Sequence, residues 1–203
     1  MKTRVLLLCC TLLLSACQTT ETLNTWSDDS QIHTFSKVLV MAVLKEPVYR
    51  NLLEQKLVDA LKAEGINAEA ASNLYPDNDV LDEVMTDAAI RQANADSVMV
   101  IRLVDTRKET VYTPGTVYVP GGYGGRYGLG YYGYYGGGYS AISTPGYTTE
   151  YNIATVETTV FDAASNKRVW STITETTETS VKNGINSYIK VIGKSVTASG
   201  LFQ

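Results

Sequence analysis

The chain contains few cysteines and a single histidine, and this scarcity excludes several kinds of chemistry. Cys9, Cys10 and Cys17 all lie in the first 17 residues, and His33 is the one histidine. A zinc site needs several Cys or His ligands, and a Ser-His-Asp or Cys-His system needs a histidine beside its nucleophile. We therefore expect no enzyme activity, no metal site and no cofactor, apart from the lipid described below.

Basic charge and long apolar runs are also scarce. Without Lys2 and Arg4, which lie in the segment we expect to be removed, 15 basic and 21 acidic side chains remain, a net charge of −6 with His33 neutral. A nucleic-acid partner would require a basic patch, so none is expected. No apolar run after the first 16 residues approaches the 18 or so that a membrane-spanning helix needs.

The first residues carry the strongest pattern in the chain. Lys2 and Arg4 give a positive start, residues 5–14 are apolar except for Thr11, and Leu14-Ser15-Ala16-Cys17 follows. A positive start, an apolar core of about ten residues and small residues before a cleavage point are typical of a secretory signal. Such a core is too short for a permanent spanning helix. We expect residues 1–16 to be a signal peptide.

The tetrapeptide Leu14-Ser15-Ala16-Cys17 resembles the bacterial lipobox. The resemblance implies cleavage between Ala16 and Cys17, a diacylglycerol on the Cys17 thiol and an N-acyl chain on its new amine. A thiolate suits thioether formation because it is the strongest nucleophile among the side chains. One cysteine left in an exported chain also calls for modification or intermolecular pairing. The alternative is an ordinary signal peptide with a chance cysteine at the cleavage site.

Gln18 follows the candidate lipid site. In enterobacteria an Asp at this position favours retention in the inner membrane, so similarity to that system implies the outer membrane, with the chain on its periplasmic face. The inner membrane is the alternative. Either way, the first expected partner is a lipid bilayer, entered by the acyl chains of Cys17.

The composition of residues 17–35 predicts a flexible tether. Polar residues dominate, and the large apolar ones are Leu23, Trp26, Ile32 and Phe35. Eighteen extended residues reach at most about 60 Å, which would let a domain stand away from the bilayer. The alternative is that part of this segment packs on the domain through Trp26 or Phe35.

Residues 36–199 predict a single α/β (α+β) domain. Continuous apolar runs with β-branched residues indicate buried strands, and apolar residues at helical spacing indicate helices. Pro47 fits a first helical turn and Gly65 a helix end. The predicted order is β-α-β-α-β-insertion-β-β-α, a mixed sheet with helices packed on it. Its elements are strands at 38–43, 66–71, 97–105, 151–161 and 167–177, and helices at about 47–64, 80–93 and 181–199.

The insertion, about residues 113–147, is a low-complexity segment. Between 121 and 139, ten residues are Gly and seven are Tyr, and Thr-Pro-Gly flanks it at 113–115 and 144–146. Ordering so many glycines costs much conformational entropy, so we expect a mobile loop. The two Thr-Pro-Gly motifs that bound it are expected to act as breakers of regular structure. Tyrosines in flexible surfaces bind proteins and stack on sugars, so a partner protein, peptidoglycan or self-association are candidate roles. The alternative is an insertion without a ligand. The candidate binding residues are Tyr123, Tyr127, Tyr131, Tyr132, Tyr134, Tyr135 and Tyr139.

Three internal stretches resemble a set of Gram-negative envelope lipoproteins. They are KVLVMAV at 37–43, LKAEG at 61–65 and FDAASNKRVW at 161–170. The domains of this set are similar to the amino-terminal domain of TolB, the curli secretion lipoprotein and the penicillin-binding-protein activator lipoproteins, and several members have no known function. The resemblance implies a non-catalytic binding or accessory domain in the periplasm. Two alternatives are an oligomeric secretion, pore or scaffold lipoprotein, and an envelope hydrolase that uses a pair of carboxylates.

Overall fold

A computed structural model describes residues 19–30, 32–75, 82–118 and 142–202. The chain divides into two compact units, Met1–Lys108 with Asn152–Gln203, and Glu109–Tyr151. The signal peptide, Cys17 and the Gly/Tyr stretch at 121–139 lie outside the described residues. None of the helices in the described ranges is long and apolar enough to cross a membrane.

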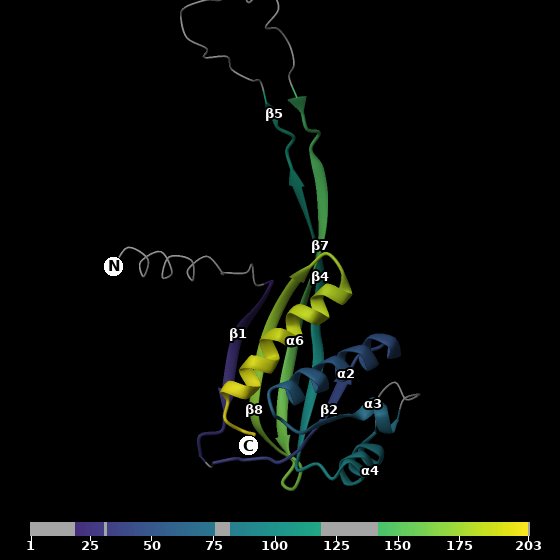
Figure 1. Ribbon diagram of the computed structural model, residues 1–203, viewed down its shortest axis with the longest axis vertical. Coiled ribbons are helices and arrows are strands. Elements are labelled where there is room, and N and C mark those ends of the chain that lie inside the picture. Colours follow the sequence, from purple (N-terminus) through teal and green to yellow (C-terminus); the bar gives the residue numbers. More distant parts are fainter. Residues whose placement is uncertain (1–18, 31, 76–81, 119–141, 203) are drawn as a thin grey trace, which may run out of the picture. The chain divides into compact units, whose positions relative to one another are not determined.

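One six-stranded sheet dominates the first unit (Figure 1). Strand β2 is parallel to β3 and β4, whereas β8 is antiparallel to β1 and β7. The sheet is therefore mixed, and the predicted α/β class is confirmed. In spatial order its strands are β1 (Thr20–Ser27), β8 (Lys167–Glu178), β7 (Tyr147–Asp162), β4 (Ser97–Thr113), β2 (Val38–Val43) and β3 (Ala68–Ala70).

Within the described ranges, four helices accompany the sheet: α2 (Pro47–Ala63), α3 (Ala71–Leu74), α4 (Glu83–Ala93) and α6 (Val181–Ala198). Pro47 lies in the first turn of α2, and Gly65 follows its end with a φ of 85°, as the sequence predicts. Asp82 caps α4 by accepting the Met85 N–H at 2.8 Å. The acid before this helix thus has a capping role.

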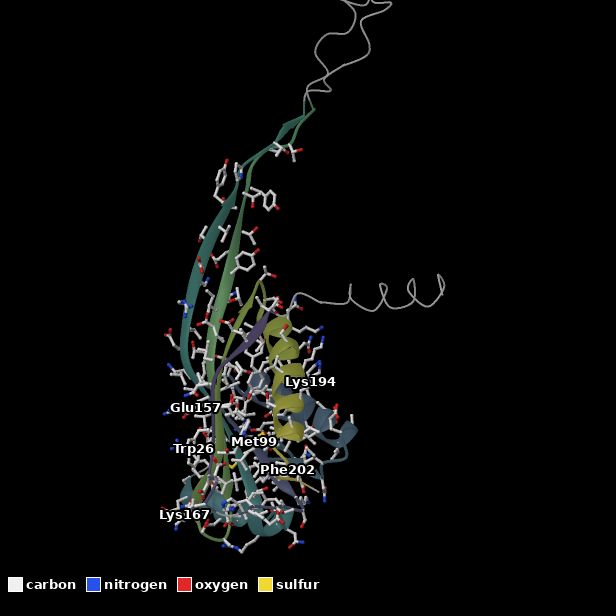
Figure 2. All side chains as sticks on the ribbon, turned by 90° about the vertical axis from the view of Figure 1, so that its left-hand side faces the viewer. Trp26, Met99, Glu157, Lys167, Lys194 and Phe202 are labelled. Carbon is white, nitrogen blue, oxygen red and sulfur yellow. The ribbon has the colours of Figure 1, made fainter. Side chains whose placement is uncertain are left out.

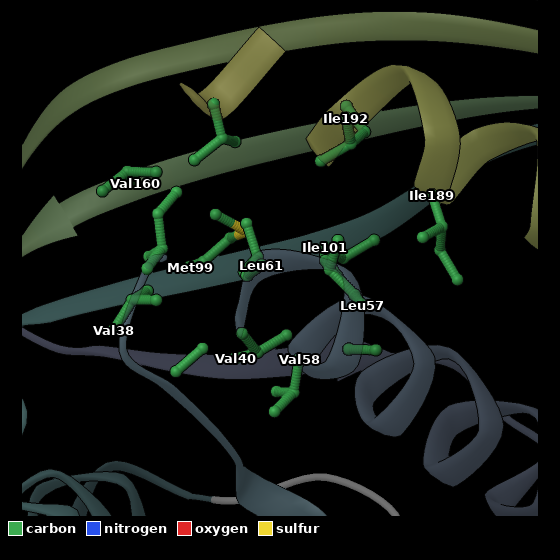
Figure 3. Close-up of a cluster of buried hydrophobic side chains, with 14 of the residues drawn as sticks. Val38, Val40, Leu57, Val58, Leu61, Met99, Ile101, Val160, Ile189 and Ile192 are labelled. Atoms are coloured by element: carbon green, nitrogen blue, oxygen red, sulfur yellow. The ribbon is translucent and has the colours of Figure 1, made fainter. Parts of the chain in front are cut away.

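The main core lies between the sheet and the helices α2 and α6 (Figure 3). Val38 and Val40 point into it from β2, whereas Leu39, the residue between them, packs with α3 and α4 on the other face. Strand β2 is therefore covered on both sides, which explains its unbroken apolar sequence. Each fully buried Val, Leu or Ile contributes about 1.5–3 kcal/mol. The central side chains are Leu57, Leu61, Met99, Ile101, Val160 and Ile192.

The predicted tether is wrong for much of its length, because Thr20–Ser27 forms the edge strand β1. Its threonines face threonines of β8: the Thr20 and Thr176 hydroxyls lie 2.9 Å apart, and those of Thr25 and Thr172 lie 3.0 Å apart. Phe35 is buried in the core, which is what the alternative for this segment predicted. Polar composition misled the prediction because threonine is both polar and a good strand former.

The second unit contains the distal part of β4, the first part of β7, and the short strands β5 (Val117–Tyr118) and β6 (Ile142–Ser143). β5 and β6 pair antiparallel, and the Thr144 N–H donates to the Thr116 carbonyl at 2.9 Å. The two Thr-Pro-Gly motifs lie where β4 ends and β7 begins. A methyl group on Gly115 would collide with the Thr144 carbonyl oxygen, so the two breakers are in close backbone contact.

Candidate partner-binding face

The side of the sheet away from α6 carries the candidate site. Directly opposed residues of β7 and β8 share a face, and Glu157 lies opposite Ile173 while Thr159 lies opposite Ser171. Val160, the next residue on β7, points into the core beneath α6. We call the opposite side, with Glu157 and Thr159, the outer face. Figure 2 shows Trp26 and Glu157 on this side of the sheet and Lys194 of α6 on the other.

An open hollow of about 430 Å³ lies on the outer face. Across it, Arg102 Nη2 of β4 and Glu157 Oε2 of β7 form an ion pair at 2.6 Å. A second pair, Arg107 Nη2 with Glu175 Oε1 at 3.0 Å, links β4 to β8. Such exposed pairs contribute about 0.2–1 kcal/mol each, so they orient the guanidinium groups more than they stabilise the fold. The lining residues are Val100, Arg102, Glu157, Thr159, Phe161 and Arg168.

Trp26 of β1 extends the hollow toward the sheet edge. The Arg168 guanidinium lies over its indole ring, 4.7 Å from the ring centroid, in a cation–π contact. Trp26 opposes Ser171 in the β1–β8 register, which places it on the outer face. The hollow and its margin thus combine an indole, a phenyl ring and two guanidinium groups on rigid strands.

The sequence did not point to this site. Phe161 and Arg168 belong to the motif at 161–170, where they appeared only as parts of a hairpin, and Trp26 fell in the predicted tether. The bulge in the β7–β8 register at Val160 and Phe161 also changes which residues share a face. Trp170, the other tryptophan, is buried in the core, as expected for an aromatic residue used in packing.

Glu54 is the buried carboxylate among the described residues, and only about 1% of it is exposed. Burial raises its pKa, an effect opposed by hydrogen bonds from Ala42 and Ser72 and by the charge of Arg50. Its Oε1 accepts the Ala42 N–H and its Oε2 the Ser72 N–H, both at 2.8 Å. Both oxygens are used to join α2 to β2 and to the start of α3, which indicates a structural role.

His33 lies beside the carboxylate of Asp28. Its Nε2 lies 3.2 Å from Asp28 Oδ2, and its ring stacks on that of Phe35 with 6.2 Å between centroids. Among the residues that the structure describes, no three His, Cys, Asp or Glu side chains gather as a metal site would require.

The residues that the sequence nominated for function fall outside the described part of the chain. They are the cleavage and lipidation residues, Ala16 and Cys17, and the seven tyrosines of the loop, Tyr123, Tyr127, Tyr131, Tyr132, Tyr134, Tyr135 and Tyr139.

The fold and the open face define a mixed α/β domain in which α2 and α6 cover one side of the main sheet, and α3 and α4 cover β2 on the other side. No known protein family and no curated protein matches the chain. Among solved structures it is similar to a PelC dodecamer from Paraburkholderia phytofirmans, at 14% identity and a TM-score of 0.41, over 90% of this chain and 94% of that one. A point variant of that dodecamer gives 14% and 0.45, over 84% and 94%. At this similarity, neither assembly nor activity is carried over.

Proposed function

We propose that the chain is a lipid-anchored, non-catalytic protein of the bacterial envelope that binds a partner protein through its outer face. The observation that carries the binding role is the hollow beside Trp26, Phe161 and Arg168 on the sheet face opposite α6. The lipobox supports the anchor, and Gln18 favours the outer membrane over the inner one.

The beginning of the sheet fits an anchor close to the domain. The Thr177 N–H donates to the Thr19 carbonyl at 2.9 Å, so the chain is already fixed at Thr19. Only Gln18 lies between Cys17 and Thr19, so the two positions are at most about 7 Å apart. An acylated Cys17 would therefore hold the domain against the bilayer surface.

The composition of the outer face favours a protein partner. Tryptophan and arginine are enriched among residues that dominate binding energy at protein interfaces, and paired charges around an aromatic centre give orientation. A glycan such as peptidoglycan usually stacks on an open aromatic ring, but the Arg168 guanidinium already lies over the indole of Trp26. Glycan binding by the tyrosine-rich segment at 121–139 is a separate proposal.

Site-specific photo-cross-linking in living cells tests the binding role. A photoreactive amino acid replaces Arg168 on the outer face or, as the control, Lys62, an exposed residue of α2. We expect a discrete protein adduct from position 168 that is absent at position 62 and reduced at least tenfold by Trp26→Ala. Adducts of equal yield from both positions, or adducts with glycan alone, would contradict a protein partner at this face.

Mass spectrometry and membrane fractionation test the anchor independently. We expect Cys17 of the mature chain to carry a diacylglycerol and an N-acyl chain, and the protein to band with outer-membrane markers. A Cys17→Ser chain should lose both properties. A Cys17→Ser chain that still incorporates palmitate would show that the lipid is attached elsewhere.

An oligomeric scaffold is the second candidate, and the β1 edge favours it. β1 pairs with β8 on one side and is the last strand of the six-stranded sheet. An unpaired edge can accept a strand from another copy. Light scattering of the acylated protein in mild detergent tests this second candidate, because a monomeric mass would exclude an oligomeric scaffold.

A further inference from the structure

The exposed side of α6 differs in charge from the rest of the chain. Although the chain is acidic, the 18 residues of α6 contain Lys182, Lys190 and Lys194 and no Asp or Glu. All three lysines are exposed. None of the ion pairs among the described residues involves them, whereas Arg102 and Arg107 on the outer face are paired with glutamates.

Two of these lysines follow a serine that touches the start of the domain. Ser187, Lys190 and Lys194 are spaced i, i+3 and i+7, so they form one stripe along α6, which we call the lysine stripe. The Thr19 hydroxyl lies 2.7 Å from the Ser187 hydroxyl, and both lie within hydrogen-bond distance of Glu178 Oε1, at 2.6 and 3.0 Å.

The contact between Thr19 and Ser187 brings the first described residue of the chain to the lysine stripe. Thr19 is two residues after Cys17, and Lys194 lies about 10 Å along the helix from Ser187. On the other flank of the exposed side, Asn186 accepts a hydrogen bond from Lys56 of α2 at 2.9 Å, which adds a further cation to the same surface. A bilayer that holds Cys17 is therefore close to this side of the domain.

We propose that the lysine stripe rests on anionic phospholipid headgroups of the bilayer that holds Cys17, an inference that depends on the proposed lipid anchor. The short anchor brings the helix within the distance, about 8–10 Å, over which charges interact at physiological salt. A lysine near an anionic surface gains about fivefold in binding. The domain then lies on α6, and its outer face points away from the lipid toward the partner.

Depth-dependent fluorescence quenching tests this orientation on the acylated protein. An acylated mature chain has no cysteine with a free thiol, so Ala198→Cys introduces a unique one on an exposed position of α6. A fluorophore on it reports contact with a quencher attached to lipid headgroups. The protein is reconstituted in phosphatidylcholine vesicles with or without about one-third phosphatidylglycerol.

We expect strong quenching with phosphatidylglycerol, and weak quenching in pure phosphatidylcholine or at about 1 M salt, where the Debye length falls to about 3 Å. Lys190→Gln with Lys194→Gln should lower the ratio of docked to undocked protein roughly thirtyfold. Lys62→Gln with Lys167→Gln changes the net charge equally at exposed sites outside α6 and should leave the quenching unchanged.

The outcomes separate this inference from the proposed function. An acylated protein that floats with the vesicles but shows quenching independent of lipid charge, or of Lys190 and Lys194, overturns the inference alone. A protein that carries no acyl chain on Cys17 overturns the anchor, and the inference falls with it. Equal losses from the stripe variant and from its control would show an effect of net charge and would also overturn the inference.

Discussion

Glu54 occupies a position on α2 that would usually be apolar. It lies on the same side of the helix as the buried residues Leu53, Leu57 and Leu61, where an unpaired carboxylate would be costly. The backbone N–H groups of Ala42 and Ser72 make the burial of Glu54 tolerable, because each donates a hydrogen bond to one carboxylate oxygen. An apolar side chain at this position would leave both N–H groups unsatisfied. One side chain thereby fixes the positions of α2, β2 and α3 relative to one another.

Replacing Glu54 with alanine should lower the free energy of unfolding by roughly 2–5 kcal/mol, since two buried N–H groups lose their acceptor. Urea unfolding followed by circular dichroism measures the loss.

Because burial raises the folded-state pKa of Glu54 above its ordinary 4.5, protonation favours the folded state. Its stabilising contribution is complete below pH 4.5 and is lost as the pH rises through the folded-state value. Glu54→Gln should remove this pH dependence; a wild-type curve parallel to that of Glu54→Gln would contradict it.

Tyr188 and Thr158 form a polar contact in the core. Their hydroxyl oxygens lie 2.6 Å apart, both residues are buried, and burial raises the pKa of the tyrosine far above its ordinary value. Tyr188→Phe alone should cost about 1–2 kcal/mol because the Thr158 hydroxyl loses its partner. Tyr188→Phe with Thr158→Val should recover most of that loss, so a double-mutant cycle should give a clear coupling energy. Additive effects would show that the contact contributes nothing.

Among the elements, those with strong hydrophobic periodicity could be predicted from the sequence. The unbroken apolar run of β2, the helix α6 and Pro47 at the start of α2 all lie where expected. β1 could not be predicted in this way, since its stability comes from pairing with β8, about 150 residues away, through threonines that look like linker residues. The outer face was missed for the same reason, because it exists only once β1, β8, β7 and β4 are side by side.

The two Thr-Pro-Gly motifs illustrate a contact that depends on glycine. A methyl group on Gly115 would collide with the backbone oxygen of Thr144 and lie 2.7 Å from the Gly146 nitrogen, whereas one on Gly146 would first meet the Tyr112 hydroxyl. A side chain can move aside and a backbone cannot. Gly115→Ala should therefore separate β5 from β6, and Gly146→Ala should be tolerated.

Amide hydrogen exchange checks this difference between the glycines. Gly115→Ala should raise exchange in the second unit, including Thr144, whose N–H donates to Thr116, while the protection of β2 and β8 in the first unit stays unchanged. Equal protection of Thr144 in both variants would show that the close contact of the breakers is not needed for pairing.

At the scale of the whole molecule, the position of β1 changes how the domain would be attached to a membrane. A tether of 18 residues would let the domain sample tens of ångströms, whereas a sheet that begins at Thr20 leaves one residue, Gln18, between Cys17 and Thr19. In the proposed arrangement, the attachment point is therefore close to the unit that carries both the lysine stripe and the outer face. An anchor of this kind restricts orientation as well as distance.

Cleavage by a glutamate-specific protease distinguishes attachment directly through β1 from attachment through a flexible tether. Glu21 is the one glutamate between Cys17 and Phe35, and it lies within β1, opposite Glu175 of β8. Cleavage in a strand requires local unfolding, whereas a flexible linker is cut readily. The acylated protein on vesicles should therefore keep its domain bound under native conditions and release it only in urea. A variant with a short Gly/Ser linker containing one Glu, inserted between Gln18 and Thr19, should release it at once. Rapid release of the unmodified protein, with the new terminus at Thr22, would mean that β1 is open in solution and that the domain is not held against the bilayer.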